Sequence, residues 1–507
     1  MPFSIWTLDI AREQSPTLDH LFQFASFTQD AGYDALGLYF EHRFAFECTP
    51  WAHGVGSVTP RMITRLQEEF PSLQIVPFIN LLGHFEGFIY TEEGKVYREE
   101  LLSGLQACPS CPEFVALCEQ MIDETIALFK SPLIHIGADE AGQLGACPKC
   151  QARMAGQAED EKAWLYAQHF GPLAQRVVDS GRRPGVWGDM FLSHPTALDA
   201  MPKETLIFDW QYHKGVAETA PTFTERGFDV IACPTLHVWN APWMHIEKTE
   251  ENVRTVCQDA RDLDLAGVCI STWECGLFGA YDTLLPAIRW AKSAIDSPET
   301  SGGIVESYAM ESAEAGRWAK IMGEDLEALG ETFAHTGIRS SIKARFLLYG
   351  NPFLLWMHHA EELCGPRGTE ALALLEQALF VAPGEAEKGV TLFVRSAIEF
   401  VRLAEQARIE YGKGQPDAAV GMLAPTRYLF ETLENVANRT HSRIGGSLAD
   451  VERCRAVRKH VETVMHRLRQ YGHRELGYLP AFEIITNPRF MPHDQASWWL
   501  INKWANQ

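Results

Sequence analysis

The sequence predicts an α/β fold, a (β/α)8 TIM barrel, followed by an all-helical C-terminal domain. Two observations predict the barrel: short apolar runs alternate with amphipathic stretches over the first 300 residues or so, and there are eight such runs. From about residue 310 the strand pattern nearly disappears, so we expect a catalytic barrel over 1–305 and a helical domain over 306–507. A doubly wound open sheet is the alternative, but no Gly-x-Gly-x-x-Gly follows the first strand.

Each expected strand is a short run rich in β-branched and apolar residues between polar loops. In chain order, the runs are 3–10, 34–41, 75–82, 133–140, 183–190, 206–212, 229–236 and 267–274. The segments between them carry apolar residues three and four positions apart, as one face of a helix requires. The clearest of these segments are 17–32, 63–70, 113–130 and 163–181. The same spacing predicts C-terminal helices over 310–333, 370–382, 389–412 and 448–472.

Composition narrows the range of functions. The 507 residues include 44 Lys and Arg against 66 Asp and Glu, so the net charge is −22. This charge repels phosphate backbones and anionic lipids, so neither nucleic acid nor a membrane is an expected partner. No apolar window of about 18 residues predicts a membrane span. Twelve Cys, several of them in apolar runs, and an N-terminus without the features of a secretion signal predict a reducing, cytoplasmic location.

Polar and aromatic residues stand at the expected strand ends, where a barrel enzyme carries its reacting groups. These residues are Asp9 and Arg12, Glu41, His84 with Glu86, Asp139 and Glu140, Trp187 with Asp189, Trp210 with Tyr212, His237 with Trp239, and Trp273 with Glu274. Any one of them could simply end an apolar strand. As a set, indoles ringed by carboxylates favour a pocket for a sugar, whose C–H face stacks on flat rings. Gly-rich loops and paired Lys, which a phosphate pocket would need, are missing.

The sharpest feature is the pair Asp139 and Glu140, which ends the run 133–140. Neighbouring residues of a regular strand point to opposite faces, so both carboxylates reach one site only where the strand gives way to a loop. Two acids held close together can differ in protonation near neutral pH, as a general acid beside an electrostatic stabiliser requires. An exposed Asp-Glu pair in a loop is the alternative interpretation.

The segment LIHIGADE (133–140) resembles the His-x-Gly-x-Asp-Glu signature of the glycoside hydrolase family 20 β-N-acetylhexosaminidases. The order of motifs is similar to that of the hexosaminidase D branch of the family, and the similarity spans about residues 1 to 290. The segments that carry this similarity are 37–46, 76–88, 107–114 and 143–150. The C-terminal part resembles the family only in its helical character.

The resemblance implies an exo-acting, retaining β-N-acetylhexosaminidase whose substrate is a small carbohydrate with a terminal non-reducing β-GlcNAc or β-GalNAc. In such enzymes the 2-acetamido group of the substrate is the nucleophile and forms an oxazolinium intermediate, without a cofactor. Glu140 would protonate the leaving oxygen and later activate water. Asp139 would orient the acetamido group and stabilise the oxazolinium charge.

The same resemblance implies further substrate-binding residues. Trp187, Trp210 and Trp273 match pocket positions at the fifth, sixth and eighth strand ends, and Glu274 would bind the hydroxyls at O4 or O6. His84 matches a His that supports the acid pair, with a purely structural role as the alternative. The remaining substrate-binding candidates are Arg12, in a first-strand segment that grips sugar hydroxyls in many relatives, and Asp189.

The chain departs from the family at the seventh strand end, ACPTLHVW, which lacks the Tyr that usually donates to the acetamido oxygen. Tyr212 from the sixth strand end is one candidate for this role. The others, from the seventh, are His237, Trp239 and Asn240.

Two Cys-Pro-x-Cys pairs follow the third and fourth expected strands. They are formed by Cys108, Cys111, Cys147 and Cys150. Four thiolates in neighbouring loops would fit a structural zinc, which would fix a loop beside Glu140. Free buried thiols in a cytosolic enzyme are the alternative interpretation.

Two other functions remain open at this point. One is a catalytically silent sugar-binding barrel, and the other is a two-carboxylate β-glycosidase with no requirement for an acetamido group. The choice between GlcNAc and GalNAc also stays open, because loop geometry distinguishes the two O4 epimers. The amphipathic C-terminal helices are compatible with a homodimer interface, with closure over the site, or with simple packing.

Overall fold

The computed structural model of the chain describes residues 3–11, 16–54, 56–101, 104–239, 241–273, 281–299, 301–335, 352–444 and 448–473. The chain forms two compact units. The first consists of Met1–Leu236, Glu250–Thr272 and Ile288–Ser301, and the second of His237–Thr249, Trp273–Ala287 and Gly302–Gln507. Among the described residues, no helix has the length and apolar character needed to cross a bilayer.

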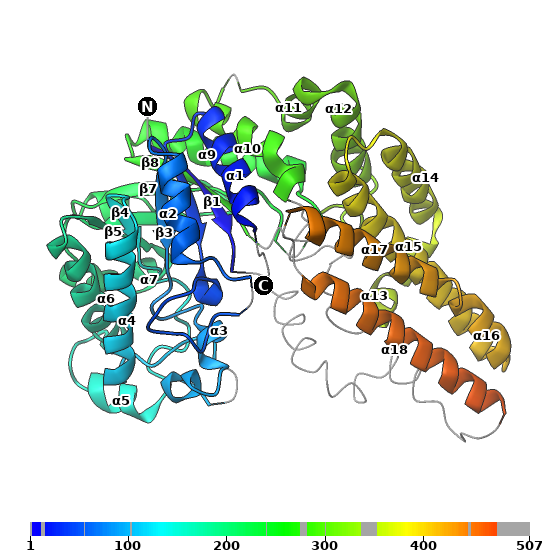
Figure 1. Cartoon of the computed structure of the whole chain (residues 1–507), viewed down its shortest axis with the longest axis horizontal. Coiled ribbons are helices and arrows are strands. Elements are labelled where there is room, and N and C mark those ends of the chain that lie inside the picture. Colours follow the sequence, from blue (N-terminus) through cyan, green and yellow to red (C-terminus); the bar gives the residue numbers. More distant parts are fainter. Residues whose placement is uncertain are drawn as a thin grey trace. The chain divides into compact units, whose positions relative to one another are not determined.

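The first unit contains a closed barrel of eight parallel strands in sequence order (Figure 1), which confirms the predicted fold class. The strands are β1 (Phe3–Asp9), β2 (Ala35–Tyr39), β3 (Gln74–Phe78), β4 (Leu133–His135), β5 (Arg183–Trp187), β6 (Leu206–Trp210), β7 (Asp229–Cys233) and β8 (Gly267–Thr272). The barrel closes where β8 pairs with β1, with Ile5 opposite Cys269. All eight expected strands are present, and each ends before the residue predicted from the sequence.

The barrel helices of the chain alternate with the strands. They are α1 (Leu18–Asp30), α2 (Pro60–Glu69), α3 (Glu86–Ile89), α4 (Pro112–Leu128), α5 (Pro148–Met154), α6 (Glu161–Asp179), α7 (Asp189–Ser193), α8 (Pro221–Thr224), α9 (Ile246–Asp262) and α10 (Tyr281–Asp296). Polar N-caps start several of them, because a side-chain oxygen satisfies a free backbone N–H there. Thr17, Thr59 and Asp160 play this role for α1, α2 and α6.

The barrel interior holds an aromatic cluster around His135, the last residue of β4. The His135 ring stacks on Phe78 at a centroid distance of 4.5 Å and lies 4.4 Å from Trp187 and 4.7 Å from Phe208. Complete burial lowers the pKa of His135 well below its usual range, because burial disfavours the charged form. His135 is therefore a neutral core residue directly below the loop that carries Asp139 and Glu140.

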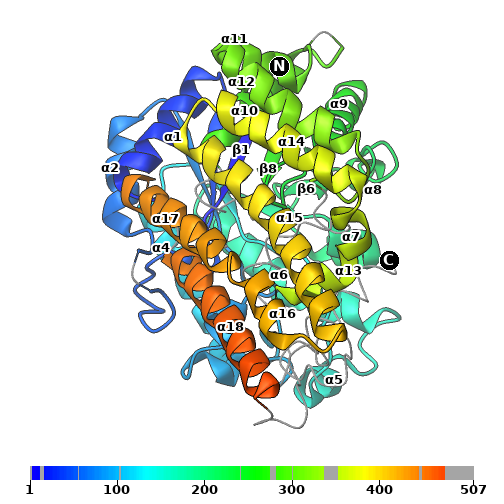
Figure 2. The same ribbon diagram turned by 90° about the vertical axis from the view of Figure 1, so that its right-hand side faces the viewer.

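The second unit is helical among its described residues. Its further helices are α11 (Ile304–Glu311), α12 (Ala313–Lys320), α13 (Phe353–Cys364), α14 (Pro366–Val381), α15 (Glu385–Gly412), α16 (Pro416–Leu423), α17 (Thr426–Ile444) and α18 (Leu448–Gly472). The long helix α15 packs against α13, α14, α16 and α17, and α17 lies beside α18 (Figure 2). The helix expected over 310–333 is interrupted: α11 ends at Glu311, Ser312 caps α12, and a π-helical turn follows at Ile321–Asp325.

Candidate active site

The loop after β4 turns sharply and brings two consecutive carboxylates to one site. The strand ends at His135, and the backbone φ angles of Gly137, Ala138 and Glu140 are +79°, +90° and +47°. The Gly137 N–H donates to His135 Nδ1 at 3.1 Å, and the Tyr166 hydroxyl donates to the Ala138 carbonyl. Left-handed backbone breaks the alternation of a strand, so neighbouring side chains can face the same way.

His84 lies between these two carboxylates. Its Nε2 is 3.0 Å from Glu140 Oε2 and 3.3 Å from Asp139 Oδ2. The side chains of His84 and Asp139 are 15% and 13% exposed, whereas that of Glu140 is 57% exposed. Asp139 is thus held at the base of the site and Glu140 at its solvent-facing edge.

A glycine makes this close approach sterically feasible. A Cβ atom added at Gly83 would lie 2.2 Å from the backbone oxygen of Asp139, well inside contact distance. The following residue, His84, adopts a φ of +50°. The segment after β3 can therefore reach the loop after β4 only with glycine at position 83.

Two further carboxylates lie on the other side of the His84 ring. His84 Nδ1 is 4.0 Å from an oxygen of Glu41 and 4.0 Å from one of Glu86. Glu41 is buried and accepts a hydrogen bond from the Tyr39 hydroxyl at 3.1 Å, and Asn80 in turn donates to that hydroxyl at 3.0 Å. The imidazole therefore lies between the exposed Glu140 and a buried, hydrogen-bonded carboxylate.

Asp189, at the start of α7, holds two groups of the site in position. One of its oxygens accepts the backbone N–H of Glu140 at 2.9 Å, and the other accepts the indole N–H of Trp210 at 3.2 Å. Burial, with a further contribution from the charge of Asp139, raises the pKa of Asp189 to about 7. Asp189 thus links Glu140 and Trp210 through one carboxylate group.

The aromatic residues predicted for the sugar pocket fall into different environments. Trp210 and Tyr212 are half-buried, and their rings lie 5.0 Å apart at 34°, so they form a partly exposed aromatic surface after β6. Trp187 is 1% exposed and packs inside the barrel against His135. The structure brings Trp210 next to Asp189, and it places Trp187 in the aromatic core.

The other predicted pocket residues belong to the second unit or lie outside the described residues. His237, Trp239 and Trp273 are part of the second unit, where the rings of His237 and Trp239 lie 4.8 Å apart. Arg12, Asn240 and Glu274 lie outside the described residues.

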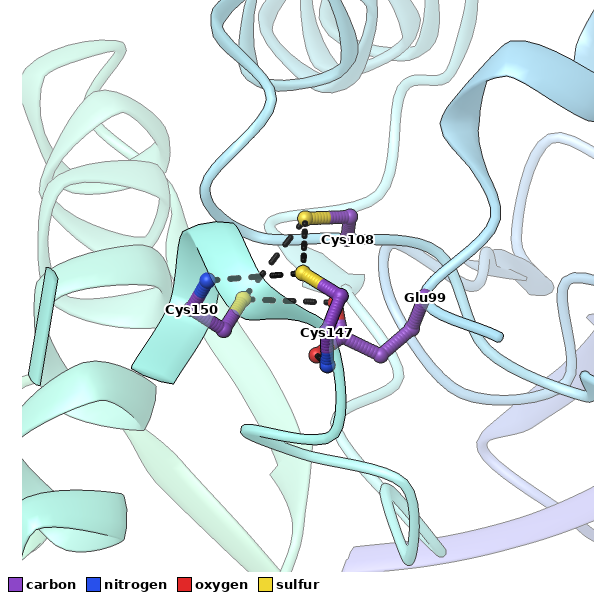
Figure 3. A group of neighbouring side chains, drawn as sticks. All are labelled: Glu99, Cys108, Cys147 and Cys150. Carbon is purple, nitrogen blue, oxygen red and sulfur yellow. Dashed lines mark hydrogen bonds between the residues drawn. The ribbon is translucent and has the colours of Figure 1, made fainter. Parts of the chain in front are cut away.

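The predicted zinc ligands separate into two environments. Cys108, Cys147 and Cys150 come together with Glu99, and their ligand atoms lie within 4.8 Å of one another (Figure 3). Cys111 is not part of this group, and its thiol donates to Glu113 Oε2 at 3.2 Å.

Several functional contacts could not be identified from the sequence. Glu41 and Glu86 stood out only as polar residues near strand ends, and nothing in the local pattern linked them to His84. Tyr166 lies in α6, and no sequence signal connects it with the Ala138 carbonyl that it binds. Gly83 offered a weak signal, as a glycine directly before a histidine in a strand-end segment.

Comparison with known proteins finds a family match over the part of the chain that contains the carboxylate pair. Residues 88–263, which include both acids, match the family described as Glycosyl hydrolase family 20, catalytic domain, as the sequence motif predicted. A β-hexosaminidase of Vibrio furnissii is 26% identical over 178 residues, which cover 32% of this chain and 27% of that enzyme. The chain therefore spans about a quarter of the length of this curated relative.

Two solved structures are also similar to this chain. A family 20 chitobiase of Flavobacterium johnsoniae aligns with 90% of this chain and 77% of its own, at 13% identity and a TM-score of 0.50. A family 20 exo-β-N-acetylglucosaminidase of Vibrio harveyi, solved in complex with N-acetylglucosamine, aligns with 58% of this chain and 53% of its own, at 17% identity and a TM-score of 0.46. At 13% identity, the likeness to the chitobiase concerns the fold alone.

Proposed function

We propose, from the family 20 catalytic domain that residues 88–263 match, that this protein is a glycoside hydrolase, an exo-acting and retaining β-N-acetylhexosaminidase. One observation carries the proposal: the consecutive residues Asp139 and Glu140 both lie within 3.3 Å of His84 Nε2. Removal of terminal β-GlcNAc or β-GalNAc with the help of the substrate's own acetamido group needs two such acids, one for the glycosidic oxygen and one for the amide.

Burial divides the roles of the two acids. Asp139 Oδ1 is buried, and no described residue provides it with a hydrogen-bond partner. A buried acceptor without a donor is costly, so a donor from the substrate would be bound favourably. The acetamido N–H is such a donor, and this hydrogen bond would direct the acetamido oxygen towards the anomeric carbon.

Glu140 is the more exposed acid and fits the role of general acid and base. As the acetamido oxygen bonds to the anomeric carbon, the bond to the leaving oxygen breaks and Glu140 gives that oxygen its proton. Water then attacks the anomeric carbon and returns a proton to Glu140, which restores the acetamide and retains the β configuration. No cofactor takes part in these steps.

His84 and Asp189 would hold Glu140 in place through these steps. His84 Nε2 is within hydrogen-bond distance of both acids, so its N–H can follow the negative charge from one carboxylate to the other. Asp189 fixes the backbone of Glu140 and the indole of Trp210, which with Tyr212 offers a stacking surface for the sugar ring.

A panel of aryl β-glycosides that differ only at C2 and C4 tests this function. We expect turnover of the GlcNAc or GalNAc derivative, at least 100-fold weaker turnover of the matching glucoside or galactoside, and inhibition by a thiazoline mimic of the oxazoline. Comparable turnover of plain β-glucosides would favour a two-carboxylate glycosidase. Sugar binding without turnover of any glycoside would favour a silent sugar-binding barrel.

A further inference from the structure

We propose that Cys108, Cys147, Cys150 and Glu99 form a structural zinc site that joins the loops after β3 and β4. Figure 3 shows the three thiols and the carboxylate converging from two segments of the first unit. Three sulfur ligands and one oxygen ligand would complete a tetrahedral site and leave no open position for substrate. Glu99 replaces Cys111, the fourth ligand that the spacing of the cysteines predicted.

The sulfur separations fit a shared metal ion. Cys108 Sγ lies 3.5 Å from Cys147 Sγ and 3.6 Å from Cys150 Sγ. Zn–S bonds of about 2.3 Å at tetrahedral angles place two sulfurs about 3.8 Å apart. A disulfide would need about 2.05 Å, so these thiols are grouped in space and not bonded to one another.

Burial and charge also point to a cation. The Glu99 residue is 4% exposed, and Cys108 and Cys150 are buried as well. Glu99 Oε1 accepts the Cys147 N–H at 2.9 Å, and Oε2 lies 3.2 Å from Cys150 Sγ. A buried carboxylate among thiols is costly unless a positive charge compensates it, and a divalent ion at this point would do so.

The local backbone distinguishes the two Cys-Pro-x-Cys pairs. Cys147 caps α5, and the backbone N–H of Cys150 donates to the sulfur of Cys147 at 3.3 Å. This hydrogen bond holds the Cys147 sulfur close to Cys150. The Cys111 N–H instead donates to the Cys108 carbonyl at 3.1 Å, and the Cys111 thiol turns to Glu113. Of the two pairs, only Cys147 and Cys150 therefore present both sulfurs to a common point.

Gln143 links this site to the carboxylate pair. It lies between Glu140 and Cys147 in the chain, accepts the Leu105 N–H at 2.9 Å and donates to Glu100 at 2.8 Å. The Leu105 carbonyl in turn accepts the N–H of Phe85, the residue after His84, at 3.0 Å. Zinc would thus hold together the loops after β3 and β4. The separation of these loops determines the distance from His84 to Glu140. This positioning role rests on the proposed function, whereas the metal site does not.

Metal content of the purified full-length protein tests the site without any substrate. We expect inductively coupled plasma mass spectrometry to find about one equivalent of zinc per chain. Cys147→Ser and Cys150→Ser should each lose it, and Glu99→Gln should release zinc to a chelator at least ten-fold faster. Cys111→Ser is the matched control and should keep its zinc. Cobalt in place of zinc should give a charge-transfer band whose intensity corresponds to three thiolates.

Three results would overturn the proposal. The first is less than about half an equivalent of zinc in the wild-type protein with all of these thiols free to react. The second is loss of zinc in Cys111→Ser together with normal retention in Glu99→Gln, which would mean a four-thiolate site. The third is an intact mass lower by two hydrogens, which would mean a disulfide. None of these results depends on whether the protein hydrolyses a glycoside.

Discussion

The His84 imidazole and the Glu140 carboxylate lie 3.0 Å apart, and both residues have left-handed backbone, with φ angles of +50° and +47°. Residues other than glycine adopt such backbone angles at a cost of about 1–2 kcal/mol each, so surrounding contacts must stabilise this conformation. Two such contacts are the close approach of Gly83 to the Asp139 backbone and the hydrogen bond from Tyr166 to Ala138. Backbone strain is thus concentrated where the two loops meet.

Replacement of Glu140 by Gln should separate substrates by leaving group. We expect kcat/KM to fall about 10²- to 10⁴-fold for glycosides with poor leaving groups, because these need a proton from Glu140. Activated aryl glycosides should lose much less. Glu86→Gln is the matched control, since its carboxylate is 4.0 Å from His84 Nδ1 and lies on the other side of the ring. Equal losses for both leaving groups would contradict the role of Glu140.

Replacement of Asp139 by Asn should impair both kinds of substrate. The amide keeps the size of the side chain but removes the charge that stabilises the oxazolinium ion in the proposed mechanism, whatever the leaving group is. We expect similar losses of about 10²-fold or more in kcat/KM for good and poor leaving groups, measured side by side with Glu140→Gln. A mild loss restricted to poor leaving groups would mean that the two roles are reversed.

His84→Asn tests the contact between His84 and the acid pair without straining the backbone. Asn tolerates left-handed φ better than most residues, so the loop should keep its shape while the imidazole is lost. We expect kcat to fall with little change in KM or in the free energy of unfolding. An equal loss of stability in His84→Asn and His84→Ala, with kcat unchanged, would indicate that His84 has only a structural role.

Asp189 should make stability depend on pH. Its pKa is raised from an ordinary 3.8 to about 7, so between these values the folded state binds more protons than the unfolded state. The contribution of Asp189 to the free energy of unfolding should therefore decrease as pH rises from about 4, by at most about 1.4 kcal/mol per pH unit, and level off above pH 7. Denaturant unfolding of the wild type and of Asp189→Asn at pH 5 and pH 8 isolates this contribution, because the other titrating groups are common to both proteins. The wild type should lose stability relative to the variant between the two pH values, and an Asn variant with the same pH dependence as the wild type would refute this assignment.

Gly83→Ala should destabilise the fold and the site together. The new methyl group would meet the Asp139 backbone oxygen, which cannot move aside as a flexible side chain could. We expect a loss of about 1–3 kcal/mol in the free energy of unfolding and reduced activity. Gly421→Ala in α16 is the control: no atom lies within 4 Å of its added Cβ, so helix propensity should make it neutral or stabilising. Equal stability of the two variants would mean that the loops do not approach as closely as described.

The sequence was sufficient to predict the barrel, because the strands are local apolar runs whose number and alternation with helices define this fold. It also predicted that the carboxylates of Asp139 and Glu140 reach one site where the strand gives way to a loop, and both lie within 3.3 Å of His84 Nε2. It could not predict that β4 stops at His135, because the left-handed turn that follows depends on contacts with Gly83 and Tyr166 from distant segments.

Three-dimensional packing also separates residues that spacing alone could not distinguish. Trp187 and Trp210 both end strands, yet one packs on His135 inside the barrel and the other is half-buried beside Asp189. Cysteine spacing predicted Cys111 as a zinc ligand, whereas the fold places Glu99 beside the other three cysteines. Glu is common on protein surfaces and gives no signal of its own in the sequence.

The most direct test of the central claim uses 4-nitrophenyl β-GlcNAc derivatives whose acetamido methyl group carries zero to three fluorine atoms. Fluorine withdraws electrons from the amide oxygen, so an enzyme in which that oxygen attacks the anomeric carbon should become steadily slower with each substitution. We expect kcat/KM to decrease with every fluorine added. A rate that does not depend on fluorination would show that the acetamido group is not the nucleophile.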